Sequence, residues 1–169
     1  AKSITLHMWE KAKDFIKKAF TVIFMATIII WFLQSFDLRF NPVTDSAQSM
    51  LGHIGSFLAP VFHPLGFGDW RASTALITGL TAKEAVVSTL AILTGTDISM
   101  LPQVLGSMFS PLAAFSFLVF TLLYMPCVAA FAAIRRELGS LYEAVCAMVM
   151  QTGIAWLVAF AIYNIGLLL

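Results

Sequence analysis

The sequence predicts an all-α, polytopic membrane protein with about three to four spanning helices, at least one of which is broken or re-entrant. Of its 169 residues, 60% are hydrophobic and 11% are charged, whereas roughly a quarter of the residues in a soluble domain are charged. Three stretches, residues 19–36, 98–134 and 144–169, contain no Asp, Glu, Lys or Arg. Each is long enough for a helix of the roughly 20 residues that cross a bilayer.

The charge and the cysteine content exclude several classes of protein. A net charge of +1 is not the strongly basic footprint of a nucleic-acid-binding protein, so no nucleic-acid partner is expected. Both cysteines, Cys127 and Cys146, lie in apolar helical runs, which argues against a secreted disulfide framework. The sequence contains no P-loop pattern and no evident hydrolase triad, so we expect no enzyme activity from this chain.

Residues 1–18 are expected to form an amphipathic interfacial helix, ahead of a transmembrane domain over residues 19–169. Apolar residues at three- and four-residue spacing mark one face, and charged residues lie mostly on the other. Such a helix rests on the lipid headgroups, and its lysines favour the cytoplasmic side. The first crossing follows over residues 19–36. The apolar face comprises Leu6, Trp9, Ala12, Ile16 and Ala19, and the charged residues are Lys11, Asp14, Lys17 and Lys18.

Residues 37–70 are a polar loop followed by an apolar but interrupted segment. The segment "SMLGHIGSFLAPVFHPLGFGDW" contains four glycines and two prolines. It is too interrupted for a clean span, so we expect an interfacial or re-entrant element. Its two histidines, His53 and His63, have no metal-ligand spacing and are expected to lie at the interface.

The next helix is predicted over residues 71–93, with Lys83 and Glu84 at its centre. A charge at membrane depth is a functional hypothesis by default. On one regular helix, Glu84 shares an arc of about 120° with several hydroxyls, and Lys83 points away from it. This pattern predicts a hydrophilic track for a cation, with Glu84 as its anionic station; alternatively, the hydroxyls pack between helices and Glu84 pairs with a distant charge. The hydroxyls are those of Thr74, Thr78, Thr81 and Ser88.

A turn-rich connection containing Gly95, Asp97, Pro102 and Gly106 is expected to lead to a helix beginning at Pro111. The last helix is predicted over residues 141–169. Arg135 and Arg136 precede this last helix. If the chain crossed the membrane four times from a cytoplasmic N-terminus, both arginines would lie outside, against the positive-inside tendency. One re-entrant element resolves this conflict.

The run "FLVFTLLYMPCVAAFAAIRRELG" carries a helix breaker beside a thiol. Pro126 has no N–H for the Leu122 carbonyl, and its ring pushes that carbonyl away. Freed carbonyls at membrane depth need protein or water as partners, and transporters use such breaks to coordinate ions. With the Cys127 thiol, the Met125 thioether and the Glu84 carboxylate nearby, the set suits a borderline transition-metal ion. The alternative is a proline kink with a small buried cysteine.

The other candidates in the last helix are weaker. Cys146 has no helix breaker beside it and is expected in the core. Gln151 and Thr152 fit either the lining of a path or small-polar packing between helices.

Two segments together resemble a known family. The stretch "ALITGLTAKEAVVSTLAIL" followed by "LLYMPCVAAFAAIRRELGS" resembles the second gate-type repeat of the bacterial ferrous iron transporter B family (FeoB). The stretches "MWEKAKDFIKKAFTVIFMATIIIWFL" and "FHPLGFGDWRAS" fit the same region. The resemblance covers roughly residues 5–139, and the last helix more loosely.

The resemblance implies a multi-pass protein of the bacterial inner membrane that imports Fe²⁺ as its substrate and holds no stably bound cofactor. In that family a GTPase domain and a first gate repeat precede the second repeat, so this chain looks like the C-terminal half of such a protein. Its partners would then be the lipid bilayer, that N-terminal half and further copies in a homo-oligomer. By analogy, Cys127 would be a gate or metal-contacting thiol, and Glu84 would face the permeation route.

Two other functions fit the same residues. A gate-type transporter of a nucleoside-like or other organic solute would line its cavity with aromatic and amide groups and would tolerate Cys127→Ser. A structural or assembly subunit would use its kinked helices only for packing, with Glu84 and Cys127 facing different neighbours.

Overall fold

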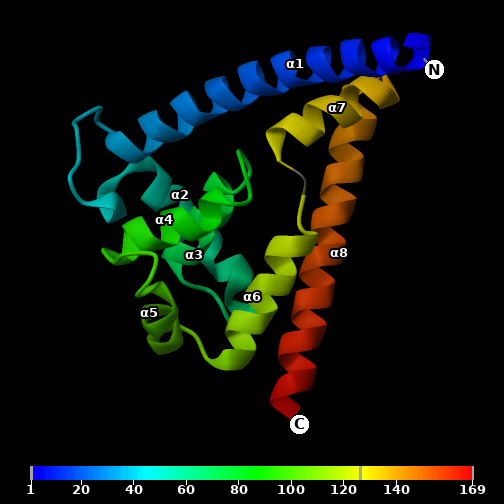
Figure 1. Cartoon of the computed structure of the whole chain (residues 1–169). Coiled ribbons are helices and arrows are strands. Elements are labelled where there is room, and N and C mark those ends of the chain that lie inside the picture. Colours follow the sequence, from blue (N-terminus) through cyan, green and yellow to red (C-terminus); the bar gives the residue numbers. More distant parts are fainter. Residues whose placement is uncertain (1, 126, 169) are drawn as a thin grey trace.

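The computed structural model describes residues 2–125 and 127–168, except for the side chains of residues 2–7, 11, 14, 15, 18 and 19. Within those residues helices joined by turns and loops make up the structure and no strand forms, as the sequence predicts. Figure 1 shows a long α1 across one end, a long α8 running away from it, and shorter helices beside them. The helices are α1 (Lys2–Ser35), α2 (Met50–Phe62), α3 (Trp70–Thr78), α4 (Ala85–Thr94), α5 (Leu101–Met108), α6 (Pro111–Leu123), α7 (Val128–Leu138) and α8 (Leu141–Leu168), with 3₁₀ turns η1 (Ser46–Gln48) and η2 (His63–Leu65).

Helix α1 is one continuous helix of 34 residues. At 1.5 Å per residue it is about 51 Å long, so the predicted interfacial helix and the predicted first crossing are joined without a helical break. It packs against α2 and α7 (Figure 1). Large apolar side chains, among them Trp9, Phe20 and Trp31, remain exposed along it.

The interrupted segment after α1 folds into short, well-capped pieces. Ser49 caps α2 by accepting the Gly52 N–H at 3.0 Å, and Asp69 caps α3 by accepting the Arg71 N–H at 2.7 Å. Between them, η2 ends at Gly66, whose φ of 87° is left-handed. Helix α2 has 13 residues, too few to cross a bilayer core of about 30 Å.

The prediction of one helix over residues 71–93 is wrong, because the helix is interrupted in the middle of this range. Helix α3 ends at Thr78 and α4 begins at Ala85. Residues 79–84, called the first break below, form tight turns in which Leu80 N–H bonds to the Ile77 carbonyl at 3.1 Å and Thr81 N–H to the Thr78 carbonyl at 3.0 Å. The predicted single hydroxyl face therefore does not exist as a continuous helical face.

A second correction concerns residues 101–108, which the sequence indicated to be a turn-rich connection. They form α5, with Pro102 in the first turn, where a missing N–H costs no hydrogen bond. Leu101 at its start and Phe109 just after its end are buried in the core. Tertiary burial thus outweighs the low helix propensity of Pro102 and Gly106.

Helices α6 and α7 are separated where the sequence predicted a break. Helix α6 ends at Leu123 and α7 begins at Val128; residues 124–127 are called the second break below, and Pro126 lies outside the described residues. Helix α6 packs along α8 (Figure 1), where the buried Ser116 hydroxyl donates to the Ala159 carbonyl at 3.1 Å. By length and composition, Pro111–Leu138, which includes the second break, and Leu141–Leu168 qualify as membrane spans among the described residues.

Candidate functional site

The two breaks lie against each other. The Val128 N–H, at the start of α7, donates to the Leu80 carbonyl at 2.7 Å. A backbone amide and a backbone carbonyl that neither helix uses internally therefore satisfy one another across the two breaks. The second break also falls near the middle of the apolar stretch Pro111–Leu138, where unpaired backbone groups are most costly.

Tyr124 fills the space between the breaks. Its side chain is only 3% exposed, it stacks on Phe120 with ring centroids 5.5 Å apart, and its hydroxyl donates to the Leu76 carbonyl at 3.2 Å. Gly79 lies directly beneath it: a Cβ there would overlap the Tyr124 hydroxyl oxygen and a methyl group of Val86. The absence of a side chain at position 79 is what lets the tyrosine enter the first break.

Lys83 and Gln151 bind the carbonyls left open at the end of α6. The Lys83 ammonium donates to the Leu122 carbonyl at 3.0 Å and to the Tyr124 carbonyl at 3.3 Å. The Gln151 amide donates to the Leu123 carbonyl at 3.2 Å. A cation at a helix C-terminus is stabilised by the helix dipole, and the Lys83 nitrogen also lies 5.0 Å from the centroid of the Tyr124 ring.

Two threonines join the helices that flank the first break. Thr78 and Thr89 are 2% and 5% exposed, and their hydroxyl oxygens are 2.8 Å apart. Thr78 also donates to the Ala75 carbonyl, and Thr81 donates to the Thr78 carbonyl at 2.7 Å. These hydroxyls are engaged with the protein itself, while the buried Thr74 hydroxyl has no hydrogen-bond partner in the described structure.

The predicted buried glutamate is not buried. Glu84 is the last residue of the first break, at the N-cap position of α4, and its side chain is exposed. The prediction assumed one regular helix, on which Glu84 faced the hydroxyls and Lys83 pointed away. Because the chain turns at residues 79–84, Lys83 points inward to the second break instead.

Cys127 lies at the N-cap position of α7, half-buried, as a free thiol. Its side chain makes no capping hydrogen bond. Met125 beside it is also half-buried. In the described part of the chain, no group of three or more His, Cys, Asp or Glu side chains could hold a metal ion. Cys127 is therefore not part of a cluster of such side chains within the described residues.

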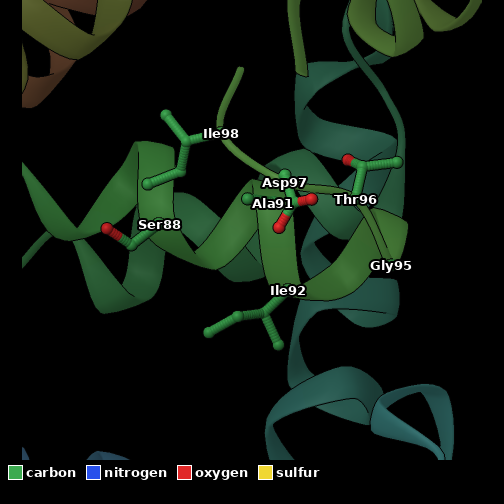
Figure 2. Close-up of a pocket in the computed structure, with 7 residues that line it drawn as sticks. All are labelled: Ser88, Ala91, Ile92, Gly95, Thr96, Asp97 and Ile98. Atoms are coloured by element: carbon green, nitrogen blue, oxygen red, sulfur yellow. The ribbon is translucent and has the colours of Figure 1, made fainter. Parts of the chain in front are cut away.

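Ser88 lies apart from the two breaks. It lines a pocket of about 480 Å³ between the exposed side of α4 and the loop that follows it. Figure 2 shows Ser88 and Ile92 on α4, with Asp97 and Ile98 on the loop that follows it. The predicted continuity of Ser88 with Thr78 and Thr81 is lost with the helix break.

The remaining sequence candidates have simple positions. His53 and His63 are exposed. Cys146 is exposed rather than in the core, because the first turns of α8 pack only partly against the chain. Thr152 donates to the Met148 carbonyl of its own helix at 2.9 Å.

The sequence analysis missed that Lys83 binds the carbonyls at the end of α6. For Gln151 it left two interpretations open, the lining of a path and packing between helices. One signal was available: a proline that frees carbonyls at membrane depth requires donors elsewhere in the chain. Lys83 was the basic residue inside the neighbouring apolar segment, and pairing it with the freed carbonyls would have placed the two segments together.

Tyr124→Phe is expected to lower the free energy of unfolding by about 1 kcal/mol, because the Leu76 carbonyl loses its buried donor. Thermal denaturation of the purified protein in detergent measures this change. Tyr142→Phe is the matched control, since Tyr142 is 80% exposed. Equal stability of the two variants would show that the Tyr124 hydroxyl does not hold the breaks together.

The described residues form helices and no strand, two stretches are long and apolar enough to cross a membrane, and two interrupted helices meet at their breaks; these are the features of a helical membrane protein. The family model described as "Gate: Nucleoside recognition" matches residues 16–141, and the chain belongs to this family.

The chain is also similar to proteins named Fe(2+) transporter FeoB. It is 40% identical over 165 residues to the one from Staphylococcus aureus (strain MSSA476), covering 98% of this chain and 25% of the relative. It is 40% identical over 169 residues to the one from Methanocaldococcus jannaschii, covering 95% and 25%. A Porphyromonas gingivalis Fe(2+) transport protein A/FeoB fusion protein is 33% identical over 216 residues, covering 99% and 26%.

These matches confirm the resemblance to the FeoB family that the sequence motifs indicated. The chain spans about a quarter of the length of these curated relatives. No solved structure matches it.

Proposed function

We propose that this chain is part of the membrane permease of a ferrous iron uptake transporter, with Fe²⁺ passing at the paired breaks. The observation that carries the proposal is the meeting of two interrupted helices beside the Cys127 thiol. The names of the similar proteins supply the substrate. A thiolate suits Fe²⁺ better than Na⁺ or Mg²⁺, which prefer oxygen ligands.

In this proposal Cys127 contacts the partly dehydrated ion at the second break. The carbonyl oxygens of Leu122 and Tyr124 lie at the same break and replace part of the hydration shell when Lys83 releases them. Glu84, being exposed, attracts the cation at the mouth of the path rather than at its centre. An incomplete ligand set favours release, since conduction requires binding that is not too strong.

The rest of the path lies in parts beyond this chain. We propose that an N-terminal half with a first gate repeat supplies the opposite wall, since transporters of this kind place the path between repeats. GTP hydrolysis would reside in a domain of that half, and this chain would contribute no catalytic residue. The assembled protein would be a multi-pass, homo-oligomeric protein of the bacterial inner membrane.

A second candidate function follows from the description of the family, which is nucleoside recognition. A nucleoside-like solute would use the aromatic and amide groups at the breaks. In this chain the Tyr124 hydroxyl and the Gln151 amide are both bonded to the backbone, which favours the ion over the organic solute. Inhibition of uptake by added nucleosides would reverse that preference.

Cys127→Ser in the complete transporter is expected to reduce Fe²⁺ uptake by iron-starved cells by about tenfold or more, because the hydroxyl is a much poorer ligand than the thiolate. Glu84→Gln is expected to raise the half-saturating iron concentration with a smaller effect on the maximal rate. Uptake of radioactive iron under reducing conditions measures both.

Cys146→Ser is the matched control, because Cys146 is the other free thiol and lies on exposed α8 surface. It should leave uptake unchanged. If all three variants transported at the wild-type rate at equal protein levels, the metal role of Cys127 would be excluded. The chain would then fit the structural or assembly subunit.

A further inference from the structure

The Lys83 ammonium occupies a cation site made by the protein itself. Two backbone carbonyls lie 3.0 and 3.3 Å from its nitrogen, and the face of the Tyr124 ring lies on another side. Carbonyl oxygens at the end of a helix, in an apolar environment, are the surroundings in which channels and transporters hold dehydrated cations. Within the described part of the chain, no carboxylate lies within ion-pair distance of Lys83.

This site coincides with the second break. The carbonyls belong to Leu122 and Tyr124, three residues or more before Cys127 in the sequence, and Val128 holds the same break against Leu80. A divalent ion that approached the Cys127 thiol and these carbonyls would meet the Lys83 charge at close range. Like charges this near in a low-dielectric environment repel strongly, so the two cations exclude each other.

The position of Lys83 also allows its ammonium group to leave the carbonyl site. Lys83 lies in the first break, between α3 and α4, and its side chain is only half-buried. Its four-carbon stem can move the ammonium without unwinding either helix. Gln151 would keep the Leu123 carbonyl bonded while Lys83 is away.

We propose that Lys83 is a tethered-cation gate: its ammonium occupies the carbonyl site when no metal is present, and an arriving divalent ion displaces it. The proposal rests on the proposed passage of Fe²⁺ at the second break. It assigns to Lys83 two effects, namely closing the path at rest and favouring divalent ions, whose higher charge displaces the ammonium more readily.

The first test uses the unaltered protein, so that folding of a variant is not in question. The purified complete transporter is treated with an amine-acetylating reagent, with and without Fe²⁺ under reducing conditions, and modification of each lysine is followed by mass spectrometry. Fe²⁺ is expected to raise the rate at Lys83 by about threefold or more as the displaced population grows. Lys13, exposed on α1, is the internal control and should not change.

The second test separates the charge from the hydrogen bond. In proteoliposomes that contain an iron-quenched dye, Lys83→Met and Lys83→Gln should raise the passive entry of Fe²⁺ by about tenfold, because both remove the blocking charge. Lys83→Arg should stay closed. If Lys83 only capped the end of α6 by hydrogen bonding, Lys83→Gln would not raise Fe²⁺ entry, because its amide still donates to a carbonyl. A Lys83→Gln variant without increased Fe²⁺ entry would therefore overturn the gate.

The outcomes distinguish the gate from the proposed function. Iron uptake without a change in Lys83 acetylation overturns the gate and leaves the permease standing. Fe²⁺-dependent acetylation without uptake supports the competition at the carbonyl site and contradicts the transport function. Absence of both effects overturns both.

Discussion

An alanine at position 79 is expected to abolish Fe²⁺ uptake and to lower the free energy of unfolding by about 1–3 kcal/mol, although only one methyl group is added. The φ and ψ of Gly79, −60° and −14°, are helical, so alanine can adopt this backbone without strain. The cost arises because the added Cβ would overlap the buried Tyr124 hydroxyl and Val86. Tyr124 would have to withdraw, and its hydrogen bond to Leu76 and the alignment of the two breaks would be lost.

Uptake by iron-starved cells and thermal denaturation in detergent measure these two effects. Gly153→Ala is the matched control, because nothing lies within 4 Å of a Cβ at that position in α8. It should be neutral or stabilising, since alanine favours a helix over glycine by up to about 1 kcal/mol. Normal uptake by the Gly79→Ala variant would show that the close approach of the breaks is not required for transport.

The largest loss of stability is expected for Gly55→Ala, at about 3 kcal/mol or more. Gly55 lies inside α2, where the helix crosses α3. A Cβ there would overlap the Thr74 hydroxyl and come within 2.9 Å of the Trp70 carbonyl oxygen and 3.1 Å of the Thr74 nitrogen. Two of these three atoms belong to the backbone, so relief requires α2 and α3 to separate.

The amount of folded protein and its melting temperature test this prediction, with Gly106→Ala as the control. Gly106 is also inside a helix, α5, but a Cβ there meets nothing within 4 Å. Helix propensity favours alanine at both sites, so opposite signs of the stability change isolate the packing contribution. If both variants were stabilised, the crossing of α2 and α3 would be looser than described.

Part of this architecture is local and was therefore predictable. The uncharged length of residues 144–169 predicts α8, whose described extent is Leu141–Leu168. The Pro-Cys pair predicts the end of α6, because a proline removes a hydrogen-bond donor wherever it stands. The glycines and prolines of residues 49–70 predict a segment too interrupted to span, and α2 with η2 agrees.

The candidate site was predictable only in part. The breaker beside Cys127 drew attention to that thiol from the sequence, and its role as a metal ligand stays a prediction. The structure places Lys83, rather than Glu84, at the second break. Nothing in the sequence from Ala72 to Leu93 forbids one helix, and Gly79 itself keeps a helical conformation. The break there arises from contacts made by Tyr124 and Val128, which lie more than 40 residues further along the chain.

The sequence by itself determined that the chain is helical, apolar enough for a membrane, and broken near Pro126, because hydrophobicity and the chemistry of proline act locally. Only the tertiary structure decided that a second helix breaks opposite the first and that Lys83, not Glu84, faces the carbonyls at the end of α6. The physical reason is that freed backbone groups in an apolar environment must find partners, and which partners they find depends on which segments fold together.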